Sequence, residues 1–368
     1  MTREQVLDAL SNVIEPDLGK DLVTLGMVKD VEVDGKRVTF TVILTTPACP
    51  LKEQIRGACV KAVHELVDAD AEVTVNMTSN VTSKPGAAAG PGRQPPVMGG
   101  IKNIIAVASG KGGVGKSTVA ANLAVALAQT GAAVGLVDTD IYGPSVPTMF
   151  GIPASEKPRV GEDRKIVPLE KFGVKLLSMG FLVDEKQAVV WRGPMVSSAV
   201  RQFLNDAAWG DLDYLVLDLP PGTGDIQLTI VQTVPLTGAI IVSTPQEVAL
   251  ADARKGVAMF GNVNVPVLGI VENMAYFTPP DLPDRKYYLF GEGGARRLAE
   301  DIAVPFLGEI PIEQSLRESG DHGTPIVEKD PDSISARAFR RIAELAAQQI
   351  SIRNADLPPT PQVEILYR

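Results

Sequence analysis

Apolar and polar positions alternate in blocks along the chain after residue 100. Six short runs are apolar without polar alternation, which is typical of strands buried on both faces of a sheet. They lie at 103–109, 132–138, 214–220, 238–244, 265–272 and 304–311. Segments with helical periodicity separate several of them, at 117–129, 195–208, 249–259 and 295–301. This alternation predicts a doubly wound α/β domain with a mainly parallel sheet and right-handed crossovers.

The first 83 residues show a different pattern. Thr2 is a typical helix N-cap, and after it Val6, Leu10 and Val13 recur on one helical face. Further elements are expected as strands at 28–33, 37–44 and 71–78 and as a helix at 51–63. We therefore predict a small α+β domain at 1–83.

Proline and glycine mark the boundary between the two patterns. Residues 84–100, KPGAAAGPGRQPPVMGG, contain four prolines and five glycines and no apolar periodicity, which is typical of a surface linker. The α/β domain is then expected at 101–350. The last residues, 351–368, include NADLPPTPQVEILYR and are expected to form a partly extended tail.

Composition argues against several classes of function. The formal net charge of -9 gives no overall attraction to a phosphate backbone and no basic run is present, so nucleic-acid binding is not expected. No run approaches the ~18 apolar residues of a membrane span, and the first residues lack the apolar core of a signal peptide. The chain has only two cysteines, Cys49 and Cys59, and no C-x-x-C. This fits a reducing compartment, and we expect a cytoplasmic protein.

The most informative motif is ASGKGGVGKST at 108–118, between a predicted strand and a predicted helix. It satisfies both the dinucleotide pattern G-x-G-x-x-G and the phosphate-loop pattern G-x-x-x-x-G-K-[ST]. Asp138 and Asp140, about 20 residues further on, are placed where an acid could bind the ribose of a dinucleotide. Lys116, however, offers an ammonium for the β/γ-phosphates and Ser117 a hydroxyl for Mg²⁺, and a dinucleotide needs neither.

A second motif also favours a nucleoside triphosphate. In LDLPPGTGD, at 217–225, Asp218 closes an apolar strand and can hold the shell of Mg²⁺, and the glycines that follow can sense a γ-phosphate. We therefore expect a triphosphate site at the carboxyl ends of the strands. Its phosphate-binding residues are expected to be Gly110, Lys111, Gly112, Gly113, Val114, Gly115, Lys116, Ser117 and Thr118.

These motifs carry a family resemblance. KGGVGKST resembles the deviant Walker A motif of the MinD/ParA group of P-loop ATPases. Together with DTDIYGPSVPTMFG, WRGPM, LDLPPGTGD, STPQEVALADARKG, ENM and GEIP, it closely resembles the Mrp/ApbC family of iron–sulfur cluster carriers. The match covers nearly all of the chain, because EPDLGKDLVTLGMV and TTPACP in the small domain resemble the SufT-like domain fused to many members.

The resemblance implies roles for further residues. Lys111 would reach across a homodimer interface to the partner's nucleotide, and action on the phosphates of its own subunit is the alternative. Asp140 matches the acid that orients the attacking water, and Asp138 is expected to support the magnesium shell. Asn273 matches the position that reads the adenine edge, with Pro311 near the base; a turn-forming asparagine is the alternative.

The chain departs from the family at the cluster site. Members usually carry C-x-x-C after ENM, but residues 272–294 contain no cysteine, so the usual site, which needs thiolates, cannot form. Cys49 is the better remaining iron–sulfur ligand, because it lies near a predicted helix start and the SufT-like resemblance implies a functional cysteine there. A structural cap is the alternative. Cys59 shares an apolar helix face and is expected in the core.

The sequence therefore predicts an ATP- and Mg²⁺-dependent hydrolase that carries iron–sulfur clusters as a nucleotide-dependent homodimer. Its expected partners are apo iron–sulfur client proteins and the cluster assembly machinery. A MinD- or ParA-like nucleotide-switched scaffold without a cluster is the alternative. Against it, the C-terminal end is polar and proline-containing rather than membrane-targeting, and no DNA-binding run is present. A dehydrogenase is a third hypothesis, which nicotinamide binding would distinguish.

Overall fold

The computed structural model describes residues 1–83, 100–181, 193–279, 281–282 and 284–356. The chain divides into two compact units. One comprises Met1–Lys84 with Ala347–Pro358, and the other Pro85–Ala346 with Pro359–Arg368. The described residues do not include the expected linker, apart from Gly100, or the final part of the expected tail. The first two residues of WRGPM also lie outside them.

The first unit is a small α+β fold, as predicted. Its elements are α1 (Arg3–Leu10), β1 (Ile14–Glu15), β2 (Lys20–Asp21), β3 (Val28–Asp34), β4 (Arg37–Leu44), α2 (Lys52–Leu66) and β5 (Glu72–Ser79). β4 is the middle strand of a three-stranded sheet, antiparallel to β3 and parallel to β5. Thr2 caps α1 as expected: its hydroxyl accepts from the Gln5 backbone N–H at 3.2 Å, and the Gln5 side chain accepts from the Thr2 N–H.

The second unit is built around an eight-stranded sheet. Its strands are β6 (Ile101–Ala108), β7 (Val134–Asp138), β10 (Leu169–Lys171), β11 (Val174–Ser178), β12 (Leu212–Asp218), β13 (Gly238–Ser243), β14 (Val267–Glu272) and β15 (Phe306–Glu309). They lie in the order β10-β11-β7-β12-β6-β13-β14-β15, and all neighbours are parallel except the antiparallel pair β10 and β11. The fold class expected from the sequence is confirmed.

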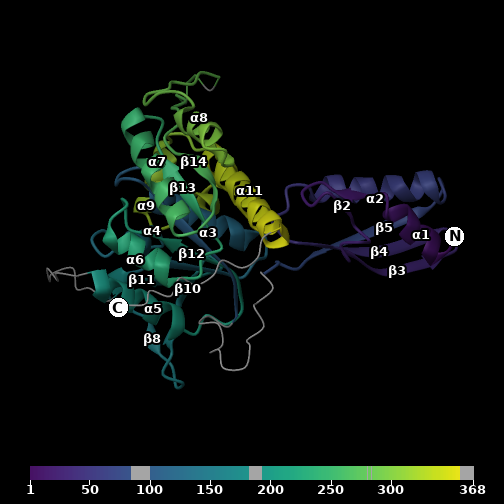
Figure 1. The fold of residues 1–368 in the computed structure, drawn as a ribbon, viewed down its shortest axis with the longest axis horizontal. Helices are drawn as coiled ribbons and strands as arrows, with labels where there is room; N and C mark the ends of the chain where they lie inside the picture. The colour runs from purple at the N-terminus through teal and green to yellow at the C-terminus, as the bar shows by residue number, and fades with distance from the viewer. Residues whose placement is uncertain (84–99, 182–192, 280, 283, 357–368) are drawn as a thin grey trace. The chain divides into compact units, whose positions relative to one another are not determined.

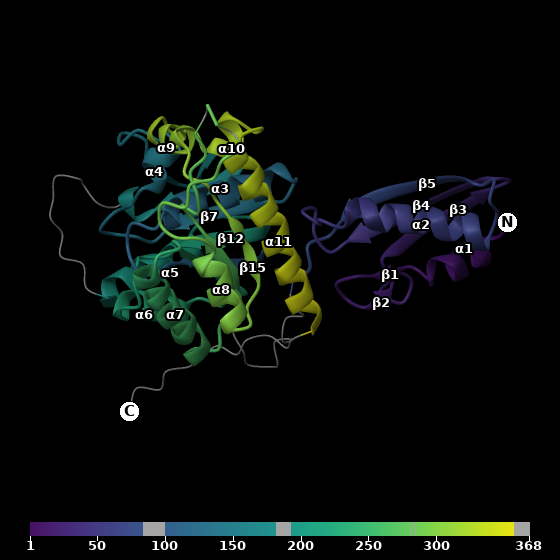
Figure 2. The same cartoon turned by 90° about the horizontal axis from the view of Figure 1, so that it is seen from above.

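Helices cover both faces of this sheet. One face carries α5 (Gly193–Asn205), α6 (Asp225–Thr233), α7 (Glu247–Asn262) and α8 (Gly294–Asp301). The other carries α3 (Lys116–Gln129), α4 (Val146–Met149), α9 (Gln314–Asp321), α10 (Ile326–Lys329) and the part of α11 (Ile334–Asp356) that precedes Ala347. Figures 1 and 2 show the two layers. A short hairpin, β8 (Arg159–Val160) and β9 (Ile166–Val167), and a 3₁₀ turn, Met179–Phe181, complete the described elements.

Several described elements, among them β10, α6 and α9, were not expected from the sequence, and two further differences concern the site and the domain boundary. β11 was not predicted, yet it is buried beside β7 in the sheet. It follows the short hairpin of β8 and β9 and the three-residue strand β10, which show no regular hydrophobic periodicity. α11 continues to Asp356, six residues into the expected tail, because Ser351, Arg353 and Asn354 on its last turns are buried in the first unit. None of the described helices is both long and apolar enough to cross a bilayer.

Candidate nucleotide site

The phosphate loop joins the central strand β6 to α3, at the carboxyl edge of the sheet. Gly113 and Gly115 have φ of 82° and 80°, a region that side chains disfavour. A Cβ on Gly110 would come within 2.2 Å of the backbone of Asp252 in α7, and one on Gly115 within 2.1 Å of Asn273 Nδ2. The glycines are therefore fixed by backbone conformation and by close packing, as a phosphate-binding turn requires.

Neighbouring loops hold the phosphate loop in place. The Ser109 hydroxyl donates to the Lys111 carbonyl at 2.9 Å, and the Gly222 N–H, in the loop after β12, donates to the Ser109 carbonyl at 2.9 Å. The Lys111 side chain is half-buried and makes no hydrogen bond or ion pair to another described residue. Gly112 is exposed and Val114 buried, while Ser117 and Thr118 are half-buried at the start of α3.

A buried ion pair lies beneath the loop. The Lys116 ammonium pairs with Asp218 Oδ1 and donates to the Ser117 hydroxyl at 3.2 Å. Asp218 and Asp138 end the adjacent strands β12 and β7, where they are directly paired in register, and both are fully buried. Two carboxylates therefore share one ammonium in a region from which water is excluded. Such a cluster keeps excess negative charge, which favours a further cation.

Burial dominates the electrostatics of this cluster. Burial, with a smaller contribution from the charge of Asp218, raises the pKa of Asp138 to about 7, although the Asp140 N–H, the Lys116 charge and the Val146 N–H oppose the shift. The pKa of Asp218 is also raised by burial, while Lys116 opposes the shift. Asp218 Oδ2 is buried without a hydrogen-bond partner among the described residues. A buried oxygen of this kind is suited to a metal shell.

Asp138 and Asp140 are oriented by different neighbours. Asp138 Oδ1 accepts from the Asp140 N–H at 3.1 Å, and its Oδ2 accepts from the Val146 N–H and the Ser178 hydroxyl at 3.2 and 3.0 Å. Asp140 Oδ1 accepts from the N–H groups of Tyr142 and Gly143, at 3.1 and 3.2 Å. The structure thus brings Asp138 next to Asp218 and holds Asp140 in the loop after β7.

Ser178 is a site residue that sequence reasoning missed. It ends β11, in register with Asp138 on β7, and its side chain is fully buried. Its hydroxyl also accepts from the Gly180 N–H at 3.0 Å, so donation to Asp138 Oδ2 is part of a fixed arrangement. The apolar run VKLLSM at 174–179 was the available signal, because a polar residue that ends a buried strand lies at the carboxyl edge.

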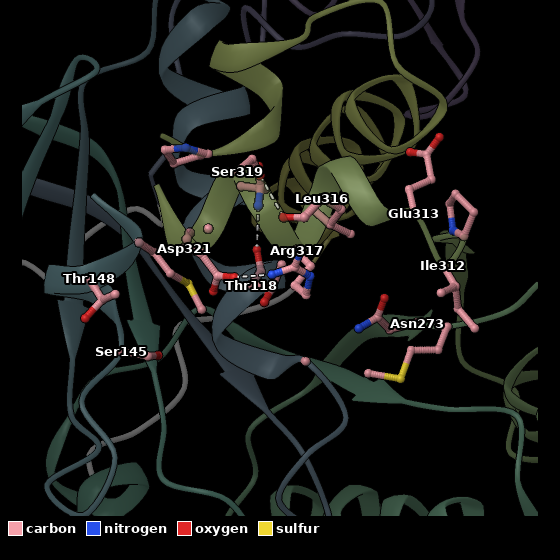
Figure 3. A pocket seen from close by; sticks show the side chains of 18 of the residues that line it. Thr118, Ser145, Thr148, Asn273, Ile312, Glu313, Leu316, Arg317, Ser319 and Asp321 are labelled. Carbon is pink, nitrogen blue, oxygen red and sulfur yellow. Dashed lines mark hydrogen bonds and ion pairs between the residues drawn. The ribbon is translucent and has the colours of Figure 1, made fainter. Parts of the chain in front are cut away.

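A cavity of about 820 Å³ opens beside the phosphate loop (Figure 3). Gly115 and Thr118 line one part of it, and Asn273, Pro311 and residues of α9 line others. The Asn273 side chain is buried, and its Nδ2 donates to the Val114 carbonyl at 2.8 Å. This bond fixes the amide orientation and leaves Asn273 Oδ1 as the acceptor. The predicted base-binding residues therefore line one cavity with the phosphate loop.

The segment after β14 is the one in which family members usually carry cluster-binding cysteines and this sequence has none. An antiparallel backbone bridge joins its two described ends. Phe277 and Tyr287 exchange backbone hydrogen bonds of 2.9 and 2.8 Å. Lys286 lies 3.7 Å from the centre of the Tyr276 ring and pairs with Glu309 at 3.3 Å. Among the described residues, no group of three or more His, Cys, Asp or Glu side chains converges as a metal site. The described residues of a single chain therefore do not form a complete set of ligands for an iron–sulfur cluster.

The two cysteines both lie in the first unit, and neither forms a disulfide. Cys49 is half-buried and precedes α2 by three residues; its carbonyl accepts from the Lys52 N–H at 3.4 Å. Cys59 is fully buried on α2, as predicted, and burial raises the pKa of its thiol to about 12. Cys59 is thus a core residue, whereas Cys49 lies at the helix start expected from the sequence.

Comparisons with known proteins agree with these two units. The sequence model of the ParA family, described as NUBPL iron-transfer P-loop NTPase, matches residues 100–347, and that of an iron–sulfur cluster assembly protein family matches residues 3–75. The "Iron-sulfur cluster carrier protein" of Synechocystis sp. is 52% identical over 96% of this chain and 99% of its own. That of Deinococcus radiodurans is 49% identical over 96% and 98%. These matches confirm the family resemblance.

A solved structure supports the same conclusion. The nucleotide-binding protein of Archaeoglobus fulgidus, in complex with ADP, is 44% identical to this chain, with a TM-score of 0.56. The similarity covers 63% of this chain and 90% of that protein.

Proposed function

Because this chain belongs to the family of NUBPL iron-transfer P-loop NTPases, we propose that it is an ATP-hydrolysing carrier that delivers iron–sulfur clusters to apoproteins. The observation that carries the proposal is the buried group of Lys116, Asp138 and Asp218 beneath a glycine loop that borders an 820 Å³ cavity. The ADP complex of the Archaeoglobus relative supports the nucleotide, and the names of the relatives favour a cluster carrier over a spatial regulator.

The donor set fits a magnesium–nucleotide complex. The Ser117 hydroxyl and the carboxylates of Asp218 and Asp138 would hold Mg²⁺, and the orphaned Asp218 Oδ2 supports this assignment. When bound, the ion neutralises charge on the β- and γ-phosphates. The backbone N–H groups of the loop would cradle the phosphates, and the Lys116 ammonium would exchange its contact with Asp218 for one with phosphate oxygens.

Two further groups complete the proposed hydrolytic site. Asp140 would orient the attacking water, because its carboxylate is held by two backbone N–H groups in the loop after β7. Lys111 would contribute its charge to the nucleotide of a second subunit, which makes hydrolysis depend on a homodimer. The lack of an intrachain partner for Lys111 among the described residues is consistent with this role.

The cargo would be held by a thiolate outside the α/β unit. The segment after Asn273 holds no cysteine until the end of the chain, and Cys59 is buried with a raised pKa. Cys49 is therefore the proposed ligand, completed by a second subunit, an apo client protein or the assembly machinery, since one thiolate cannot hold a cluster alone. We place this activity in the cytoplasm, in line with the scarcity of cysteine.

Anaerobic reconstitution tests the cargo. The full chain is incubated with iron and sulfide, its visible absorption and bound iron are measured, and transfer to an apo-ferredoxin is followed. We expect Cys49→Ser to remove most bound iron and transfer while ATP hydrolysis is unchanged, and Cys59→Ser, the matched control, to retain both. Wild-type protein that stays colourless and transfers nothing would contradict the carrier function.

Lys116→Ala tests the nucleotide chemistry separately. The loss of the ammonium should abolish ATP hydrolysis and weaken ATP binding, because no neutral side chain replaces that charge at the phosphates. Phosphate release and calorimetric titration measure the two effects. Undiminished hydrolysis in this variant would rule out the P-loop mechanism.

A further inference from the structure

Polar residues of three neighbouring strands form one row at the carboxyl edge of the sheet. Ser178 of β11 is in register with Asp138 of β7, and Asp138 is in register with Asp218 of β12. All three side chains are fully buried. Residues in register at the ends of parallel strands lie side by side at one edge of a sheet. The row therefore begins at Ser178 and ends at the ion pair of Asp218 with Lys116 beneath the phosphate loop.

The two carboxylates of this row differ in how firmly they are held. Asp138 accepts three hydrogen bonds from the described residues, two from backbone N–H groups at 3.1 and 3.2 Å and one from the Ser178 hydroxyl at 3.0 Å. Asp218 pairs with Lys116 through Oδ1, whereas its Oδ2 has no hydrogen-bond partner among the described residues. Asp138 is therefore the fixed carboxylate of the row, and Asp218 is the one that is open to a new contact.

The Ser178 hydroxyl has one direction in which it can donate. Its oxygen accepts from the Gly180 N–H at 3.0 Å, and its single proton is given to Asp138 Oδ2. An ionised carboxylate can only accept hydrogen bonds, so the two groups match without any alternative arrangement. Hydrogen bonds to a charged acceptor are also stronger than those between neutral groups. The turn at Gly180 thus holds the hydroxyl, and the hydroxyl holds the carboxylate.

This arrangement bears on the cation that the site favours. Asp138 and Asp218 share the single ammonium of Lys116, which leaves excess negative charge in a buried region. A magnesium ion demands near-ideal octahedral placement of its oxygen ligands and bound waters. Groups that orient such oxygens through hydrogen bonds typically change metal affinity 10–100-fold when they are removed. Among the described side chains, Ser178 is the one that donates a hydrogen bond to Asp138.

We propose that Ser178 is a positioning residue for the magnesium site: its hydroxyl holds the Asp138 carboxylate in the orientation that the magnesium shell requires. Ser178 itself contacts neither the ion nor the nucleotide. It raises the affinity of the nucleotide-bound protein for the cation and leaves the contacts between the phosphate loop and the nucleotide unchanged. The inference rests on the proposed nucleotide-binding function, and it adds to that function a determinant of cation affinity from β11.

Metal titration of the full chain, bound to a non-hydrolysable ATP analogue, tests the proposal. Mn²⁺ is the probe because it prefers the same oxygen ligands as Mg²⁺, and electron paramagnetic resonance measures the free ion. We expect Ser178→Ala to weaken Mn²⁺ binding about tenfold, while calorimetry shows wild-type affinity for ADP in EDTA. Its ATP hydrolysis should need more magnesium for half-maximal rate and approach the wild-type rate at saturation. Ser178→Thr keeps the hydroxyl and should keep the Mn²⁺ affinity.

Ser243→Ala is the matched control. Ser243 ends β13 at the same edge and is equally buried, but its hydroxyl donates to the Thr244 carbonyl at 3.2 Å. This variant should bind Mn²⁺ as wild type does.

Three results would overturn the positioning role. They are wild-type Mn²⁺ affinity in Ser178→Ala, an equal loss in Ser243→Ala or Ser178→Thr, and a loss of ADP affinity in EDTA as large as the loss of Mn²⁺ affinity. Failure of wild-type protein to bind ADP would instead contradict the proposed function, and this inference with it.

Discussion

Gly115→Ala should destabilise the α/β unit, and the structure gives this free-energy cost two separate causes. The first part is conformational: at φ of 80°, a side chain costs about 1–2 kcal/mol. The second is steric, because the new Cβ would lie 2.1 Å from Asn273 Nδ2 and displace it from the Val114 carbonyl. Loss of that buried hydrogen bond costs about 1–3 kcal/mol, so Gly115→Ala should lower the free energy of unfolding by about 2–5 kcal/mol.

Gly113→Ala is the matched control for the steric part. Gly113 has nearly the same φ, 82°, but a Cβ there would meet no atom within 4 Å. It should therefore incur only the conformational cost. The difference between the two variants, about 1–3 kcal/mol, isolates the contact with Asn273.

Urea unfolding without nucleotide measures both effects. Trp209 is buried in the core of the α/β unit, so its fluorescence reports on the unfolding of this unit. With a slope of about 2–3 kcal/mol/M, the midpoint of Gly115→Ala should lie roughly 0.3–1.5 M below that of Gly113→Ala. Coincident midpoints would show that Asn273 moves aside at no cost, and would refute the reasoning from the 2.1 Å contact.

Three further predictions concern other parts of the chain. Lys111→Ala and Asp140→Ala should each impair ATP hydrolysis, and mixing the two proteins should restore part of it, because a mixed dimer with action in trans has one intact site; no recovery would favour action within one subunit. Cys59→Ser should lower stability by about 1–3 kcal/mol in calorimetry, because it places a hydroxyl in an apolar core. Burial raises the pKa of Glu272, so stability should fall as the pH rises from about 4.5 through that higher value. Glu272→Gln should flatten the decline in thermal melts, and an unchanged slope would contradict this.

The sequence predicted the central part of the sheet because its strands are apolar on both faces. The strands from β6 to β15 that carry long apolar runs were located within a few residues, and the phosphate loop followed from the spacing of its glycines and Lys116. β11 was not predicted, because it has only five residues and follows short, irregular strands. Segments of this length are too short to show a clear hydrophobic periodicity.

The parts of the site that were missed depend on tertiary contacts. Ser178 orients Asp138 from 40 residues away, through strand pairing that local patterns do not encode. The α9 residues that line the cavity are placed by the packing of α9 against α4. Motif spacing identifies groups that lie close in sequence, whereas the carboxylate orientation and the cavity wall arise only when distant segments meet.

The strand order has a consequence for biogenesis. β6 and its phosphate loop leave the ribosome before the other strands of the eight-stranded sheet, yet β6 lies inside that sheet, with β12 on one side and β13 on the other. The cavity beside the loop is lined by residues as late as Pro325. During synthesis, the loop therefore exists for more than 200 residues before its cavity is complete. A nucleotide that binds only the completed cavity stabilises the finished domain and not its nascent fragments. Under the proposed function, cellular nucleotide would therefore stabilise only those chains whose α/β unit is complete.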